Sequence, residues 1–526
     1  MRNLLVALVF IAALFAGCSG SRDSGGAEPT PPTPAEMYAP IVTPVVHGPD
    51  ARVLPMSAYP GEIPVLAEHY VAERGGGEPT IAIDRDGVAI YPSIAFDVPA
   101  GATNLASTRV MRSSDEGRNW TDATPTLGNL GQVRAAPTSL DPYVYADPVT
   151  GRLFNIDLNL AAGGFLSWSD DGAQTWMSNP ACCGLPVDDH QTLFSGPATT
   201  LVATPLYPGR IVYFCVNQIA SSSCTHSLDG GLTFSGATSA FPGVEPRTDN
   251  PQSPLCGGLH GHGHASEATG TVFLPKGQCG IPTVARSEDN GLTWEVVRLS
   301  DSYGIDGHEA IVSTDRAGNV YYFFLDGDTL PRLSVSRDDG RTWSEPMNVT
   351  APGVTTAKFP SIVAGEEGKI AFLYVGSTTP VGRHLDEREP CNDNDPMTPN
   401  RQCPLLHPAE RENATWNTYV GFSLDALSDS PVFATVTAHP ADDPVMRGSC
   451  AGRCQVNGGG MYDFLDIDVN PLTGQVWVAY VDNCNDDTPY HSAPCNGPEG
   501  RFDSYLRARA AVGVQVGGTL LGTRLP

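Results

Sequence analysis

Short apolar runs recur in pairs along the chain, and a polar turn separates the two members of each pair. Clear copies begin near residues 80, 144, 265, 310, 361 and 464, among them TIAIDRDGVAIY and VYADPVTGRLFNI, and a looser copy joins QTLFSGPATT to RIVYF. Two apolar runs flanking a turn that contains Asp, Asn or Gly form the pattern of a β-hairpin. The pattern therefore predicts an all-β chain built from repeated hairpins.

A second motif, Ser-x-Asp-x-Gly-x-Thr-Trp, alternates with these hairpins. It occurs five times at intervals of 49 to 60 residues, and its aspartates are Asp115, Asp171, Asp229, Asp289 and Asp338. A tight turn needs a short carboxylate to accept backbone N–H groups, a glycine with positive φ, and an aromatic ring that packs on the next strand. The departures conserve this turn chemistry; they are Ala173 for Gly, Asn119 for Thr and Phe234 for Trp.

The motif resembles the Asp box of the sialidase and BNR-repeat superfamily. Together with the hairpins, it implies a β-propeller of four-stranded antiparallel blades, in which the boxes hold turns and do no chemistry. Seven units start near Glu78, Asp141, Asp189, His260, Asp306, Lys358 and Asp463. In the sixth, Ser423-Leu424-Asp425 is a degraded box, and the seventh has no box. Six blades are the alternative, if the last segment only closes the ring.

The N-terminus predicts export. Arg2 precedes an apolar run that is too short to span a bilayer, and Leu14-Phe15-Ala16-Gly17-Cys18 resembles a bacterial lipobox, with Phe15 where Leu is usual. We therefore expect a signal peptide over 1–17, a lipid on Cys18, a flexible Ser/Gly/Pro tether over 18–40 and a single propeller domain over 41–526. The protein would lie on the outer face or in the periplasm and touch the membrane only through the anchor. A plain secretory signal is the alternative.

Charge and cysteine content agree with this location. A total of 31 Lys and Arg against 58 Asp and Glu gives a net charge of −27, which excludes nucleic-acid binding through a basic surface. Of the 13 cysteines, those other than Cys18 form sequence-close groups, which favours disulfides in an exported chain. The pairs are Cys215 with Cys224, Cys256 with Cys279, Cys391 with Cys403, Cys450 with Cys454 and Cys484 with Cys495, and Cys182 and Cys183 are adjacent. A zinc knuckle is the competing explanation, but only Cys450 and Cys454 have ligand-like spacing.

The repeat also predicts which end of the propeller carries the site. The hairpin turns and the Asp boxes should share one end, the box face. The long connections, the insertion from about Ser377 to Ala414 and the paired cysteines should share the opposite end, the loop face. Bridged loops on a rigid scaffold are typical of binding and catalytic sites, although the bridges could serve only to restrain long loops.

Polar residues enter the inner strands on the loop face. We expect catalytic groups among Asp189, His190, Asp306, His308, Glu309, Tyr462 and Asp463. His260, His262 and His264 should point the same way along an extended strand and could share a divalent metal such as zinc or calcium. A His–carboxylate pair equally suits general acid/base catalysis. The alternative is a hydrogen-bonded polar lining of the channel.

The family resemblance implies glycan chemistry. Sialidases grip a carboxylate with three arginines and use a Tyr–Glu pair and an Asp. Here Arg52-Val-Leu-Pro55 only approaches their first-blade motif, and the convergence of Arg109, Arg112, Arg286 and Arg332, or of Tyr462 with Glu309 or Glu78, depends on the fold. We expect a cell-surface, sialidase-like propeller that binds or hydrolyses glycans. The alternatives are a non-catalytic propeller that binds a surface protein or another ligand, and a metal-dependent hydrolase.

Replacing Cys18 with Ser should release the protein from membranes, because the acyl chain would lose its attachment atom. Fractionation and acyl labelling of both forms measure this. Membrane association and labelling that persist unchanged in the variant would show that the protein is not a lipoprotein.

Overall fold

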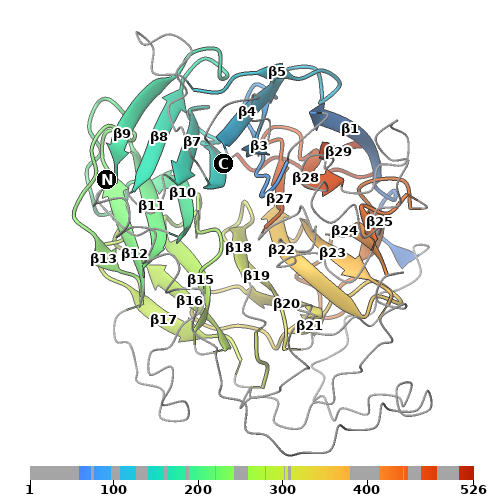
Figure 1. Ribbon diagram of the computed structural model, residues 1–526. Coiled ribbons are helices and arrows are strands. Elements are labelled where there is room, and N and C mark those ends of the chain that lie inside the picture. The colour runs from blue at the N-terminus through green and yellow to red at the C-terminus, as the bar shows by residue number, and fades with distance from the viewer. Residues whose placement is uncertain are drawn as a thin grey trace, which may run out of the picture. The chain divides into compact units, whose positions relative to one another are not determined.

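The computed structural model describes residues 58–72, 76–95, 107–125, 140–158, 163–183, 189–218, 221–241, 259–278, 280–300, 302–305, 310–327, 329–379, 414–441, 443–447, 464–482 and 509–525. All of them belong to one compact unit, Val42–Pro526. They form seven antiparallel sheets around a central channel and contain no α-helix (Figure 1). The described part of the chain holds no helix able to cross a membrane. The predicted seven-bladed propeller is confirmed.

Each of the first six blades is built from consecutive strands. Blades one to three contain β2 (Ala82–Ile83), β3 (Ala89–Ala95), β4 (Ser107–Ser113) and β5 (Thr121–Asp122); β6 (Leu140–Ala146), β7 (Leu153–Leu158), β8 (Gly164–Ser169) and β9 (Met177–Cys182); and β10 (Asp189–Pro197), β11 (Arg210–Gln218), β12 (Ser221–Ser227) and β13 (Thr238–Ser239). Blades four to six contain β14 (His264–Ala265), β15 (Val272–Gln278), β16 (Ile281–Ser287) and β17 (Glu295–Arg298); β18 (Ile311–Thr314), β19 (Val320–Leu325), β20 (Pro331–Ser336) and β21 (Met347–Asn348); and β22 (Thr356–Ala364), β23 (Ile370–Ser377), β24 (Thr415–Ser423) and β25 (Ala434–Thr437), with β26 (Met446–Arg447) beside β24.

The seventh blade joins the two ends of the chain. Its inner strands are β27 (Asp466–Val469), β28 (Val476–Asp482) and β29 (Arg509–Gly517), and its outer strand is the N-terminal β1 (Val65–Ala72). Strand β1 pairs with β29 from Val65 opposite Gly517 to Ala72 opposite Ala510. The Tyr480 hydroxyl donates to Glu68 at 2.5 Å across the same sheet. No continuous turn connects β29 to β1, which explains why the seventh blade has no Asp box.

The Asp boxes form the predicted turns. In the fourth blade, Ser287 Oγ accepts the Gly291 N–H at 2.9 Å, and Asp289 accepts the backbone N–H of Thr293 at 2.8 Å and its hydroxyl at 2.6 Å. The degraded box retains part of this pattern, because Asp425 accepts from the Ser423 hydroxyl and from the Val432 N–H. The carboxylates of these aspartates accept hydrogen bonds from backbone groups of their own turn, as expected of scaffold residues.

One box residue also fastens two blades together. Asn290 is fully buried and adopts a left-handed φ of 58°. Its Oδ1 accepts the backbone N–H groups of Thr199, Thr200 and Leu201, at 2.8 to 3.0 Å, from the hairpin turn of the third blade. Its Nδ2 donates to the Tyr213 hydroxyl at 2.7 Å. Hairpin turns and boxes therefore lie on one face, as the repeat predicted.

Asn290→Gly should lower the free energy of unfolding by about 1–3 kcal/mol, since three partly buried N–H groups lose their acceptor while the left-handed backbone is still allowed. Denaturant unfolding measures the loss. The matched control is Glu116→Gly at the same position of the first box, where φ is 62° and the side chain is exposed. An equal effect at both positions would contradict the role of the amide.

Candidate functional site

The inner strands begin on the loop face with an irregularity that recurs in several blades. Glu78, Asp141, His190 and Phe359 occupy this position and have φ between 48° and 56°. The pairing register shifts beside the last three of them. Non-glycine residues with left-handed backbones are uncommon and cluster at functional sites. The left-handed backbone of these residues therefore costs free energy at the mouth of the channel.

Three successive blades are linked at this mouth by carboxylates. Glu78 accepts the backbone N–H of Asp141 at 3.1 Å, and Asp141 in turn accepts the N–H of His190 at 3.4 Å. The Gln191 side chain donates to the Asp141 carbonyl. Asp189, beside them, is exposed. We name Glu78, Asp141, Asp189 and His190 the mouth ring; Glu78 and His190 are buried, Asp141 is half-buried and Asp189 is exposed.

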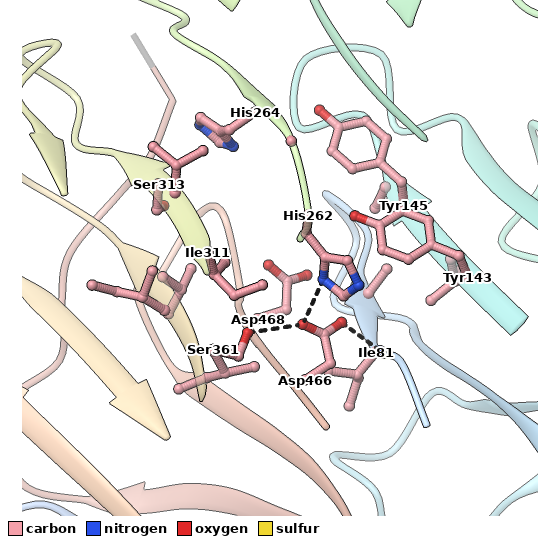
Figure 2. A pocket seen from close by; sticks show the side chains of 18 of the residues that line it. Ile81, Tyr143, Tyr145, His262, His264, Ile311, Ser313, Ser361, Asp466 and Asp468 are labelled. Carbon is pink, nitrogen blue, oxygen red and sulfur yellow. Dashed lines mark hydrogen bonds and ion pairs between the residues drawn. The ribbon is translucent and has the colours of Figure 1, made fainter. Parts of the chain in front are cut away.

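Below the mouth ring, the channel holds a buried acid and imidazole. His262 Nδ1 lies 3.8 Å from Asp466 Oδ1, and the Tyr143 ring packs edge-on against the imidazole with centroids 4.5 Å apart (Figure 2). Asp466 also accepts the Ile81 N–H at 3.1 Å and the Ser361 hydroxyl at 3.3 Å. Five blades thus contribute to this one contact group, which holds the centre of the ring together.

The C-terminal segment reaches the box-face end of the channel, where Arg524 lines the cavity. Asp468 accepts the Ile83 N–H at 2.8 Å and pairs with Arg524 at 3.4 Å. Arg524 donates its own backbone N–H to the Pro471 carbonyl at 3.0 Å. His264 Nε2 lies 2.9 Å from the Thr314 hydroxyl at the same level. The cavity of the channel extends to this end, where Asp468 and Arg524 line it, whereas the Phe464 ring packs against His190 and His262 on the side of the loop face.

Burial controls protonation in the channel. It raises the pKa of Asp466 to about 7 and lowers the pKa values of His260, His262 and His264 to about 3. The three imidazoles are therefore neutral at pH 7. The cavity lined by His262, His264, Asp466 and Asp468 has a volume of about 80 Å³. That is room for a few water molecules, far below the roughly 300–1,000 Å³ of ordinary ligand sites, so a sugar does not fit there.

Sequence reasoning missed a second buried network between the third and fourth blades. Lys276 is 3% exposed, and its Nζ donates to Ser222 Oγ at 3.3 Å and lies 5.2 Å from the Phe241 ring. No carboxylate pairs with it among the described residues, and burial lowers its pKa to about 8. Asn217 joins the network by accepting the Ser222 hydroxyl at 2.9 Å. The lysine within the apolar run TVFLPKG was the available signal.

The structure separates the three predicted metal-binding histidines. His260 contacts the third blade through its backbone N–H on Asn217, His262 faces Asp466, and His264 faces Thr314. Within the described ranges, no group of three or more His, Cys, Asp or Glu side chains is arranged to hold a metal ion. A metal on these histidines stays a prediction, and it would need further ligands. Asp306, His308, Glu309, Tyr462, Asp463 and Cys18 lie outside the described residues.

Four of the predicted cysteines are described, and all four are bridged. Cys215 and Cys224 join the paired strands β11 and β12, and Cys182 is bonded to Cys183 at the end of β9. Both bridges lie towards the loop face, as expected. The Cys215–Cys224 bridge lies in the same hairpin as the pair Asn217 and Ser222, two residues away along each strand. It therefore restrains the Lys276 network. The other eight paired cysteines lie outside the described residues.

Three of the four described arginines named from the sequence contact separate partners, and the fourth, Arg109, lies in β4 of the first blade. Arg112 donates to the Gly172 carbonyl, and Arg286 pairs with Glu288 and Glu295, in both cases at the box face. Arg332 pairs with Asp326 at 2.7 Å near the loop face. These three do not share a ligand position, so they form no common carboxylate grip of the sialidase kind.

No family model and no curated protein match the chain. Solved structures that resemble it include the Hadza microbial sialidase Hz136, with 14% identity and a TM-score of 0.37, covering 85% of this chain and 68% of that one. The NanB sialidase from Streptococcus pneumoniae has 12% identity and a TM-score of 0.39, covering 88% and 71%. A protein of unknown function from Dyadobacter fermentans has 12% identity and a TM-score of 0.43, covering 88% and 100%. Resemblance at this level concerns the fold alone.

The buried histidines should make the protein sensitive to acid. Their folded-state pKa values of about 3 lie below the ordinary 6.5, so the unfolded chain binds more protons between these values and stability falls as the pH drops below 6.5. Asp466 acts in the opposite sense, since its raised pKa favours the folded state as the pH falls from about 7 to 3.8. The loss of stability from the three histidines is larger than the gain from the one aspartate.

Denaturant unfolding at about pH 7.5 and 5.5 should show a net loss of a few kcal/mol, at most about 1.4 kcal/mol per histidine and pH unit. His264→Gln, which can still bond Thr314, should reduce that loss by about 1 kcal/mol. Equal stability at both pH values would contradict the neutral buried state of these rings.

Proposed function

We propose that this protein is a glycan-directed propeller whose binding site is the mouth of the channel on the loop face. The observation that carries the proposal is the mouth ring, in which Glu78, Asp141 and His190 are held in left-handed conformations and joined by carboxylate to N–H hydrogen bonds. Carboxylates accept hydrogen bonds from sugar hydroxyls, and paired carboxylates are the usual catalytic groups of glycoside hydrolysis. The ring therefore suits both recognition and acid/base chemistry.

The charge of the ring favours neutral sugars. Glu78, Asp141 and Asp189 are all acidic groups, whereas Arg112 and Arg286 lie at the opposite, box face and Arg332 is fully buried beside Asp326. A carboxylate-bearing sugar would approach these acids against like-charge repulsion. We therefore expect neutral oligosaccharides to bind better than sialylated ones, in contrast to the sialidases with which the fold is shared.

Calorimetry with lactose, chitotriose, mannotriose and 3′-sialyllactose tests the site, and release of reducing sugar or of sialic acid tests hydrolysis. Asp189→Ala should weaken binding or turnover about tenfold, because it removes an exposed acceptor without disturbing the core. The matched control is Asp86→Ala, an exposed aspartate in the first hairpin turn on the box face.

Unchanged binding and turnover in Asp189→Ala, or no binding to any of these sugars by the folded protein, would contradict the proposal. Binding without release would identify a lectin-like protein, and release would identify a glycoside hydrolase.

A further inference from the structure

A second opening lies on the box face, between the first and second blades. It is a groove of about 570 Å³, formed by the end of β4, the strand β5 and the residues that follow it, and the second Asp box. This volume lies within the range of small-ligand sites, unlike that of the cavity in the channel. The groove is assembled from two blades, so its shape is fixed by the propeller itself.

The polar groups of the groove have unused hydrogen-bonding capacity. Arg112 donates its Nε–H to the Gly172 carbonyl, and its two amino groups have no hydrogen-bond partner among the described residues. Asp122 is exposed and accepts the Thr124 N–H through one oxygen only. Gln174 is exposed at the rim, and its amide donates to the Asp171 carbonyl. Donors and acceptors therefore face the same opening.

An aromatic ring completes the groove. Trp176 donates its Nε1–H to the Ala123 carbonyl at 2.7 Å, which ties the indole to the first blade and leaves it partly exposed. The equivalent rings differ: Trp343 bonds a carbonyl of its own box, and Phe234 replaces Trp in the third box. Trp294 resembles Trp176 in bonding the preceding blade, but Leu292 stands where the second box has Gln174.

We infer that this groove, which we name the Trp176 groove, is a second saccharide-binding site, separate from the mouth ring. A rigid aromatic ring offers the apolar faces of a sugar a packing surface, while mixed donors and acceptors around it satisfy the hydroxyl groups. The acids Asp122 and Asp171 and the net charge of −27 oppose a polyanion. The groups at the rim are polar, whereas a peptide site would need apolar side-chain pockets.

The test uses the full-length protein and calorimetry with short gluco-, manno-, galacto- and chito-oligosaccharides. Asp122→Ala with Gln174→Ala changes two exposed side chains and should weaken binding of at least one sugar about tenfold. Trp176→Leu should weaken it at least as much. Trp294→Leu is the matched control, because it removes the corresponding ring and hydrogen bond between the third and fourth blades.

The outcomes separate this site from the mouth ring. Binding that survives Asp189→Ala and is lost in the Trp176 groove variants, but not in Trp294→Leu, supports the groove even if the proposed function fails. Binding that is lost in Asp189→Ala and unchanged in the groove variants overturns the groove and leaves the proposed function intact. No binding to any of the sugars at about 10 mM overturns the groove as well.

Discussion

The closure of the ring by β1 and β29 is the constraint on which the rest of the molecule depends. Seven sheets can surround a channel only if the last one meets the first, and the chain achieves this by pairing Val65–Ala72 with Arg509–Gly517. Tyr480 and Glu68 reinforce the joint with a hydrogen bond between residues more than 400 positions apart in the sequence. Every contact across the channel, including that between His262 and Asp466, presupposes this closure (Figure 1).

Closure also brings polar groups from many blades into a dry space, where each needs a partner. Ile81, Ser361 and His262 surround Asp466, and Ile83 and Arg524 hold Asp468. Burying a charge without such partners is expensive, which explains why the channel holds neutral imidazoles and an aspartate of raised pKa. Asp189 of the mouth ring and the rim of the Trp176 groove differ from the channel in being exposed to solvent, and they are therefore the places where we expect a ligand to bind.

The local parts of this structure could be predicted from sequence, and the long-range parts could not. Each Asp box is made by contacts within eight residues, so the turn roles of Asp289 and even of the degraded Asp425 could be recognised in the sequence. The spacing of the boxes and hairpins predicted seven blades. The strand β1 was missed because its partner lies at the other end of the chain. The histidines at 260, 262 and 264 lie in or just before the inner strand of the fourth blade, but their partners Asn217, Asp466 and Thr314 come from three other blades. Strand alternation predicts the direction of a side chain and not what it meets.

The position of β1 as an outer strand also sets the direction in which the chain leaves the propeller. Outer strands run from the box face towards the loop face, so Val65 lies at the box-face end of the sheet. The hydrogen bond from the Thr519 N–H to the Glu62 carbonyl keeps the first and last described segments together there. A lipid on Cys18, which the sequence predicts, would therefore be joined to the propeller through the segment that precedes the box-face end of β1.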